Sequence, residues 1–314
     1  MREVEMWLDL LAIVACFVIF ERASNYLVEG LGTISRKFII SEAVLGASIA
    51  AIGSSIPEFG SSAFSVIAGH PTIGLGTIIG SAIFNITVII GTVALFGKYK
   101  LSKRIFYRDG LFYLLAVVIA VVCVADGDIS RIEAIVWALT FLGYLGWLVY
   151  DARRGKPVPK KAVRVLSTGR AAAYVIGGLI FIALGAWLLV HSVISLATEA
   201  GISEALFSLV VVAVGTSIPD LITSIQAARK GMGSLAVSNA LGSNIFDILA
   251  CLGIPLSFRA TTSVQDIAGI SIIYLLVSLL LVLLVIRVGW KLSRRDAGLL
   301  FGAYGFYLGL ILLL

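Results

Sequence analysis

Acidic residues stand inside apolar stretches of this sequence, in short motifs that resemble one another. The segment 215–220 reads GTSIPD and the segment 242–247 reads GSNIFD, so each sets a carboxylate among small, hydroxyl and amide residues. Two earlier segments have a similar pattern, GSSIPE at 53–58 and GSAIFN at 80–85. A charge at the centre of a membrane helix costs about 2.5–3.5 kcal/mol, so such residues are rare there and usually functional.

These motifs offer the kinds of oxygen atom that bind hard cations. Glu58, Asp220 and Asp247 supply up to three negative charges. Neutral oxygens come from the side chains of Ser54, Ser55, Ser81, Asn85, Thr216, Ser217 and Ser243. Backbone carbonyls near Ala51 and Ala213 would add to them. Carboxylates combined with neutral oxygens suit Ca²⁺, and Na⁺ uses the same oxygen types. The residues alone therefore predict a cation site and leave the identity of the cation open.

The motifs belong to an internal duplication. Residues 40–91 and 202–253 share 17 identities in 52 positions without a gap, at an offset of 162 positions. Chance agreement between two apolar stretches would give scattered Ile and Ala matches, whereas here Pro, Gly and Ser match and an acid stands opposite an acid. We interpret these segments as two copies of one unit.

A proline stands directly before the acid in two of the motifs. Pro57 cannot donate a hydrogen bond to the carbonyl of Gly53, and its ring clashes there, so we expect the helix to kink or break between these residues. Backbone carbonyls freed at membrane depth are tolerated where they line a polar cavity. A lone proline is more often a plain kink, but its repetition before Glu58 and Asp220 favours a functional break.

The composition is that of an integral membrane protein. The 314 residues are 60% hydrophobic and 13% charged, against about 25% charged residues in soluble domains. A transmembrane helix needs about 20 apolar residues. Ten such spans are expected, at 7–29, 42–69, 72–96, 110–125, 131–150, 171–198, 204–229, 232–257, 266–287 and 296–314. We predict an all-α integral membrane protein with ten transmembrane helices.

The duplication divides these spans into two groups of five. We predict a first five-helix repeat at 1–150 with its motif at 46–91, a basic loop at 151–170, and a second repeat at 171–314 with its motif at 208–253. An odd number of spans turns the second copy upside down, which gives two inverted five-helix repeats with broken helices at the midplane. Because one chain contains both halves of the site, we expect it to function as a monomer.

Basic residues predict how the chain is oriented. Twenty of the 24 Lys and Arg residues fall in or beside alternate loops, on one side of the membrane. By the positive-inside rule this side is cytoplasmic. We expect a multi-pass protein of the cell membrane, in contact with lipid, with the loop 151–170 in the cytoplasm and both termini outside. The loop has no aromatic residue and the topology explains its charge, so we do not expect nucleic acid as a partner.

Two other classes of function are open to the same residues. A passive cation channel usually assembles its pore from several subunits, whereas this chain contains both halves of one site. Paired acids also serve intramembrane aspartyl proteases, but the proline before each acid and the surplus of hydroxyl groups favour coordination over acid–base catalysis. We therefore expect a transporter with no enzymatic activity and no cofactor.

The motifs resemble those of a known family. GTSIPDLITS at 215–224 and GSNIFDI at 242–248 are similar to the second alpha-repeat of cation/Ca²⁺ exchangers, and the segments 53–58 and 76–85 are similar to the first. The resemblance implies antiport of Na⁺ for Ca²⁺ by alternating access. It places the cation ligands at Glu58, Asp220, Ser54, Ser55, Thr216, Ser217, Ser81, Asn85, Ser243 and Asp247, with backbone help from Ala51 and Ala213.

Within this family the acids at 220 and 247 most resemble those of potassium-dependent exchangers, so K⁺ is a further candidate ion. Members that exchange H⁺ for Ca²⁺ typically carry a Gly-Asn pair before the acid, which this sequence lacks. The loop 151–170 is too short for the Ca²⁺-sensing domains of animal exchangers, which implies a prokaryotic type. One Ca²⁺ balances two carboxylates, so the third charge, on Asp247, predicts a monovalent ion (K⁺, Na⁺ or H⁺) beside it.

Overall fold

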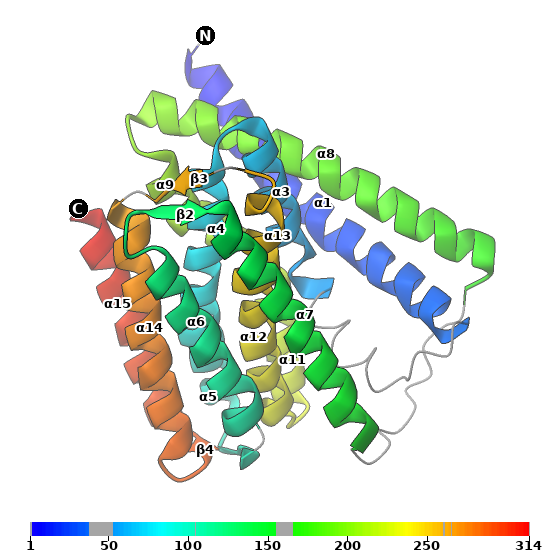
Figure 1. Cartoon of the computed structure of the whole chain (residues 1–314), viewed down its shortest axis with the longest axis vertical. Helices are drawn as coiled ribbons and strands as arrows, with labels where there is room; N and C mark the ends of the chain where they lie inside the picture. The colour runs from blue at the N-terminus through cyan, green and yellow to red at the C-terminus, as the bar shows by residue number, and fades with distance from the viewer. Residues whose placement is uncertain are drawn as a thin grey trace.

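The computed structural model describes residues 2–37, 53–103, 105–154, 166–259, 261–264 and 266–313. These residues form a helical bundle with two short two-stranded sheets in its loops (Figure 1). The first half contains α1 (Arg2–Lys37), α3 (Ile56–Ala68), α4 (Pro71–Phe84), the π-helical turn η1 (Asn85–Ile89), α5 (Ile90–Phe96), β1 (Tyr99–Lys100), the π-helical turn η2 (Ile105–Gly110), α6 (Leu111–Cys123), β2 (Asp128–Ser130) and α7 (Arg131–Arg154).

The second half has a similar succession of elements. It contains α8 (Thr168–Ala200), α9 (Glu204–Phe207), the π-helical turn η3 (Ser208–Val212), α10 (Ala213–Thr216), α11 (Ile218–Arg229), α12 (Gly233–Phe246), the π-helical turn η4 (Asp247–Leu252), α13 (Gly253–Leu256), β3 (Thr261–Ser263), α14 (Asp266–Arg287), β4 (Lys291–Leu292) and α15 (Arg294–Leu312).

Helices lie at the expected spans, as far as the described residues reach. Within those residues, six helices are long and apolar enough to cross a membrane, or seven if the bent pair Glu204–Thr216 and Ile218–Arg229 is one span. This number is lower than the ten expected spans. One reason is that α3 is described over only 13 residues, because the expected span 42–69 lies outside the described residues up to residue 52.

Two of the spans form the centre of the bundle. In their most apolar parts, 83% of Pro71–Phe96 and 72% of Gly233–Leu256 are buried, against 22–44% of the other four spans. The outer helices expose large apolar side chains, such as Leu179, Phe181 and Leu184 of α8. Exposed apolar surface of this extent is expected where lipid surrounds a protein.

The duplication extends to the boundaries of the helices. α3 and α11 begin 162 positions apart, and α4 and α12 are displaced by 162 positions at both ends. η1 and η4 begin at the same displacement. Because the two copies begin and end their central elements at matched residues, the repeat read from the sequence is also a repeat of local structure.

The helices break directly before the prolines. Ser55 (φ −95°, ψ 12°) and Ser217 (φ −81°, ψ −1°) precede α3 and α11, and both are turn residues. Pro57 and Pro219 then stand in the first turn of a helix, where a missing N–H is tolerated. In the second repeat the helical segments on the two sides of the break meet at 41°. The expected break is confirmed there; in the first repeat, part of the preceding chain lies outside the described residues.

Glycines let α4 pack closely against the second repeat. A β-carbon at Gly76 would lie 2.2 Å from Oγ of Ser208, and one at Gly80 would lie 2.2 Å from the carbonyl oxygen of Leu209. Side chains at these positions would push α4 away from η3, and small residues commonly serve this purpose between membrane helices. The central helix of the first repeat is thereby held against the segment that leads to the break in the second.

The two small sheets mark opposite ends of the bundle (Figure 1). β1 pairs with β4, with Tyr99 opposite Leu292, and β2 pairs with β3, with Ile129 opposite Thr262; both pairs are antiparallel. In Figure 1 both ends of the chain lie towards the end of the bundle that carries β2 and β3, whereas α7 runs from there towards the end that carries β4.

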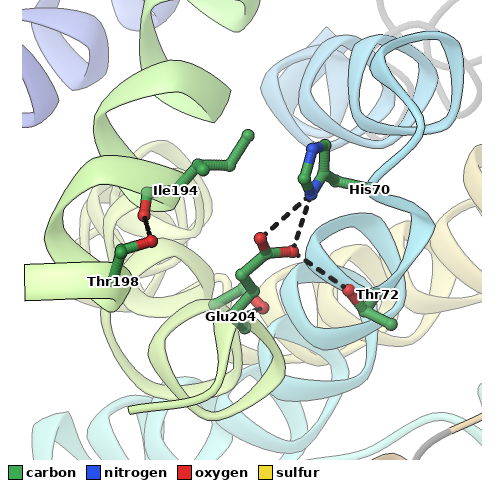
Figure 2. Close-up of polar contacts among 6 residues, drawn as sticks. His70, Thr72, Ile194, Thr198 and Glu204 are labelled. Atoms are coloured by element: carbon green, nitrogen blue, oxygen red, sulfur yellow. Dashed lines mark hydrogen bonds and ion pairs between the residues drawn. The ribbon is translucent and has the colours of Figure 1, made fainter. Parts of the chain in front are cut away.

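A polar contact joins the two repeats near the β2–β3 end. Figure 2 shows the carboxylate of Glu204, at the start of α9, directed toward His70, the residue before α4, and toward Thr72 in the first turn of α4. The Glu204 oxygens lie 2.9 and 3.0 Å from His70 Nδ1, and Thr72 Oγ1 donates to Glu204 Oε2 at 3.4 Å. The contact fixes the first turn of α9 against the start of α4.

Candidate functional site

The two repeat-matched acids lie at the breaks. Glu58 and Asp220 stand in the first turns of α3 and α11. Their side chains are 0% and 1% exposed. A buried carboxylate is costly unless it is hydrogen-bonded, paired with a charge or bound to a metal ion. The positions of both acids therefore require compensating partners in the protein interior.

Asn85 and Asp247 are the first residues of the π-helical turns η1 and η4. Ser81 and Ser243 precede them by four positions, on the same helical face, and all four side chains are fully buried. A π-helical turn inside an α-helix is uncommon and is frequent at functional sites. The matched motifs of α4 and α12 therefore present polar side chains to the centre of the bundle.

Hydrogen bonds join side chains of the two repeats. Ser81 Oγ on α4 lies 2.7 Å from Ser217 Oγ at the second break. Asn85 Nδ2 donates to Asp220 Oδ2 at 3.4 Å. Both pairs cross from one copy of the duplicated unit to the other, so the predicted ligands meet at the interface of the repeats.

Ser243 lies between Asp220 and Ser54. Its hydroxyl donates to Asp220 Oδ1 at 3.4 Å and lies 3.5 Å from Ser54 Oγ. These distances are at the upper limit for a hydrogen bond, so the interactions are weak. A cation that bound between these oxygens would have little hydrogen-bond energy to displace.

Five buried side-chain oxygens of the predicted site accept no hydrogen bond from the described residues. They are Glu58 Oε1, Glu58 Oε2, Ser55 Oγ, Asn85 Oδ1 and Asp247 Oδ2. Buried polar atoms are nearly always satisfied in folded proteins, so each exception requires an explanation. Oxygen atoms that remain unpaired in one cluster, three of them on carboxylates, fit a site that is completed by a bound cation.

The structure does not show the two free backbone carbonyls that the sequence predicts at Ala51 and Ala213. Ala51 lies outside the described residues. The carbonyl of Ala213 accepts hydrogen bonds from Ser217 N at 3.2 Å and from Thr216 Oγ1 at 3.3 Å. It is therefore not a freed carbonyl in this structure, because the break falls one residue after Thr216 and leaves its bond to Ser217 intact. Coordination by Ala213 would require these bonds to be given up.

The three acids do not form a metal site on their own. Among the described residues, no group of three or more His, Cys, Asp and Glu side chains is arranged to hold a metal ion. Glu58 nevertheless interacts electrostatically with both Asp247 and Asp220. A cation bound there would therefore need neutral oxygens beside the acids to complete its coordination.

Asn244 is not among the ligands predicted from the motifs, but in the structure it contacts Asn85 directly. Its side chain is fully buried and bonds to Asn85, to the carbonyl of Ala82 and to the hydroxyl of Tyr113. One signal could have revealed it. Position 244 matches position 82 in the repeat, and a large polar side chain has replaced Ala82 inside an otherwise matched motif.

Comparison with known proteins gives consistent matches over nearly the whole chain. Residues 8–150 and 170–313 match the family described as sodium/calcium exchanger protein. A putative antiporter of Alkalimonas amylolytica, CaxA, is 30% identical over an alignment of 286 positions, gaps included, that covers 87% of this chain and 88% of CaxA. The sodium/calcium exchanger MaX1 of Methanosarcina acetivorans is 29% identical over an alignment of 329 positions, gaps included, that covers 91% of this chain and 93% of MaX1.

A solved structure is similar in fold as well as in sequence. The sodium–calcium exchanger NCX_Mj, soaked with Na⁺ and Sr²⁺, superposes with a TM-score of 0.67 at 29% identity. The match covers 97% of this chain and 99% of that protein. The chain therefore shares the fold of that exchanger over nearly all of the residues compared.

Proposed function

The chain belongs to the sodium/calcium exchanger protein family, and from this premise we propose that it is a secondary active antiporter that exchanges Na⁺ for Ca²⁺ across a membrane. Two relatives that it matches over most of their length are named as a putative antiporter and as a sodium/calcium exchanger. The resemblance predicted from the motifs is confirmed, and the proteins that the chain resembles are transporters and not enzymes.

One observation carries the assignment of the site. The unpaired buried oxygens of Glu58, Ser55, Asn85 and Asp247 lie where the two repeats meet: Asn85 bonds to Asp220, and Glu58 is close enough to Asp247 and Asp220 for their charges to interact. We infer that the cations bind there, to Glu58, Asp220, Ser54, Ser55, Ser81, Asn85, Thr216, Ser217, Ser243 and Asp247. The carbonyls of Ala51 and Ala213 belong to the same proposed set. This donor set consists of oxygen atoms alone, which suits Ca²⁺ and Na⁺.

The charges suggest how the ions share the site. Glu58 and Asp220 balance one Ca²⁺, and Na⁺ competes for the same oxygens. Asp247 adds a third buried negative charge, with one carboxylate oxygen unpaired. A charge of this kind recruits a cation or a proton. We infer that Asp247 holds a monovalent ion, Na⁺, K⁺ or H⁺, beside Ca²⁺, and no resident cofactor is needed.

Alternating access requires the site to open to each side in turn. We propose that ten transmembrane helices form two inverted five-helix repeats (1–150 and 171–314), with the motifs 46–91 and 208–253 around one midplane site. The shared helix boundaries and the cross-repeat bond between Ser81 and Ser217 support this arrangement. Because a single chain contains both halves of the site, we propose that it works as a monomer.

We further propose that the β1–β4 end of the bundle, with the loop 151–170, faces the cytoplasm and that both termini are outside the cell. The positive-inside rule and the placement of both chain ends near β2 and β3 support this orientation (Figure 1). We expect the protein in the cell membrane, surrounded by lipid. Labelling of a cysteine introduced at position 160 in intact cells tests it: reaction with an impermeant reagent would contradict the orientation.

Flux measurements test the proposed exchange directly. The full-length protein is reconstituted in lipid vesicles loaded with Na⁺, and uptake of labelled Ca²⁺ is followed while Na⁺, K⁺ and pH are varied separately. We expect Ca²⁺ to enter the vesicles only when the Na⁺ gradient is directed outward, so that Na⁺ leaves as Ca²⁺ enters. Uptake without any counter-ion would identify a passive cation channel, and uptake driven only by a pH gradient would identify H⁺/Ca²⁺ antiport.

A further inference from the structure

We propose that Asn244 is a positioning residue of the cation site, which holds the side-chain amide of Asn85 so that its Oδ1, and not its Nδ2, faces the transported cation. The proposal rests on the proposed function and deepens it, because Asn244 lies outside the set of ligands that the motifs predict. It follows from a chain of hydrogen bonds in which each step determines the next.

The first step fixes the orientation of Asn244. One end of its amide lies 2.9 Å from the carbonyl oxygen of Ala82. A backbone carbonyl can only accept a hydrogen bond, so this end must be the Nδ2 donor. The same nitrogen lies 2.9 Å from the hydroxyl oxygen of Tyr113, and this bond uses the second hydrogen of Asn244 Nδ2. The orientation is therefore determined by chemistry and not by the similar shapes of the two ends of an amide.

The second step transmits this orientation to Asn85. Because Nδ2 of Asn244 is engaged, its Oδ1 is the atom that faces Asn85, at 2.9 Å. An oxygen can only accept here, so Asn85 must present Nδ2 to it. The other hydrogen of Asn85 Nδ2 points to Asp220 Oδ2 at 3.4 Å. Both donors of the Asn85 amide are thereby directed away from the position of a cation.

The third step leaves one atom for the ion. Asn85 Oδ1 is buried and accepts no hydrogen bond from the described residues. A reversed amide would place this oxygen against Asn244 Oδ1 and against the Asp220 carboxylate, so that acceptors would face acceptors. It would also direct an N–H at the cation. Asn244 makes this reversed orientation unfavourable, and the site keeps a neutral oxygen ligand at position 85.

The repeat explains why the second copy has an orienting asparagine at position 244 and the first copy has alanine at the matched position 82. Asn244 matches Ala82, the residue whose carbonyl it contacts, 162 positions away. Asn85 matches Asp247, and a carboxylate presents an oxygen in either orientation. The amide at 85 needs a partner that orients it, whereas the carboxylate at 247 does not. An alanine at position 82 is therefore sufficient in the first copy.

A double-mutant cycle tests the proposal. Na⁺-driven Ca²⁺ uptake into vesicles is measured for wild type, Asn244→Leu, Asn85→Ser and the double variant. Leucine is close to asparagine in shape but forms no hydrogen bond, and serine keeps one oxygen without an amide to orient. We expect Asn244→Leu to raise the Ca²⁺ concentration at half-maximal rate roughly tenfold, with a smaller change in maximal rate. In the Asn85→Ser background, Asn244→Leu should change the half-maximal Ca²⁺ concentration by less than about twofold.

Two further variants serve as controls for this experiment. Asn244→Ala introduces no steric conflict and replaces Asn244→Leu if that variant does not elute as a single folded species. Tyr113→Phe is the matched control: it removes one of the two bonds from Asn244 Nδ2 but leaves the bond to Ala82, so the amide keeps its orientation. We expect the half-maximal Ca²⁺ concentration of Tyr113→Phe to stay within about twofold of wild type.

The outcomes separate this inference from the proposed function. If the Asn244 substitution changes the half-maximal Ca²⁺ concentration by the same factor in both backgrounds, the positioning role is overturned, because its effect then does not act through the amide of Asn85. An effect of Tyr113→Phe as large as that of Asn244→Leu would overturn it as well. If wild type itself shows no Na⁺-driven Ca²⁺ uptake, the proposed function has failed, and the positioning role of Asn244 fails with it.

Discussion

The two copies of the duplicated unit share a backbone but differ in the side chains that they bring to the centre. α4 and α12 begin and end at matched positions, and the π-helical turns that follow begin at matched positions too. The first copy places Glu58 and Asn85 at the site, whereas the second places Asp220 and Asp247. The copies thus supply equal scaffolds and unequal charge.

This difference shows which part of the molecule is free to vary. Helix boundaries depend on Pro, Gly and Ser residues, which the copies share, because these residues decide where a backbone can break or approach another. The chemistry of the site depends on single positions between them, such as 82 and 244, where Ala stands opposite Asn. A symmetric scaffold can therefore hold an asymmetric site.

The largest effects are expected where the copies agree. Glu58→Gln and Asp220→Asn each remove one of the two charges that balance Ca²⁺. Loss of one partner of a buried charge pair costs about 2–5 kcal/mol, so we expect Ca²⁺ exchange to fall roughly 100-fold or more. Vesicle flux measures it, and elution as a folded protein is the control. Exchange at the wild-type rate in either purified variant would remove that acid from the site.

Exchanging the residues at the matched positions 85 and 247 should reduce Ca²⁺ exchange almost as much. The double substitution Asn85→Asp with Asp247→Asn conserves the total charge and would be harmless if the copies were interchangeable. A carboxylate at 85 cannot donate to Asn244 Oδ1 or to Asp220 Oδ2, which now accept bonds at 2.9 and 3.4 Å. We expect exchange to fall at least about tenfold.

The single substitutions Asn85→Asp and Asp247→Asn are the controls for this exchange of residues. Full activity of the double variant in the same vesicle assay would show that the site tolerates either arrangement of charge, and that the asymmetry between the copies has no function.

A smaller effect is expected for Asp247→Asn alone. The change keeps the shape and one oxygen but removes the third charge, which we assign to a monovalent ion. Ca²⁺ binding should weaken less than in Glu58→Gln, by about tenfold or less, while the dependence of flux on K⁺ or on pH changes. Na⁺-driven Ca²⁺ flux is measured against K⁺ concentration at two pH values. Curves that superimpose on wild type would place Asp247 outside the ion path.

The smallest effect is expected at the end of the bundle shown in Figure 2. His70 precedes α4, and Met232 precedes α12 at the matched position. His70→Met makes the copies alike at this position and removes the contact with Glu204, whose two side chains are only partly buried, at 37% and 25% exposed. Such pairs are worth about 0–1 kcal/mol.

We therefore expect the free energy of unfolding of His70→Met to change by less than about 1 kcal/mol, and the flux by less than about twofold. Thermal unfolding and vesicle flux measure the two quantities. A loss of flux as large as that of Asp247→Asn would show that the contact between His70 and Glu204 takes part in the transport cycle.

The sequence predicts the break and the duplication well, because both depend on local chemistry. Proline removes one hydrogen bond at a known position, and the 162-residue offset applies to backbone and side chains alike. The π-helical turns at Asn85 and Asp247 were not predicted, since the period of apolar residues barely changes when one residue is inserted into a helical turn.

Other features depend on contacts between distant segments. The bond from Asn244 to Tyr113 joins residues 131 positions apart, and the contact between His70 and Glu204 joins residues 134 positions apart. No local pattern reveals such pairs. The expectation that the carbonyl of Ala213 is free was wrong for a local reason. A proline frees the carbonyl four residues before it, whereas the carbonyl of Ala213 lies six residues before Pro219.

The 41° bend at Ser217 also has an electrostatic consequence. The helical run Glu204–Thr216 ends there and α11 begins, so a negative helix-dipole end and a positive one meet beside the site. Each is equivalent to about half an elementary charge. The positive end stabilises the negative charge of Asp220 by roughly 0.3–1 kcal/mol, and the negative end attracts a cation. A straightened helix would cancel both ends, and the site would then lose affinity without the loss of a single charged residue.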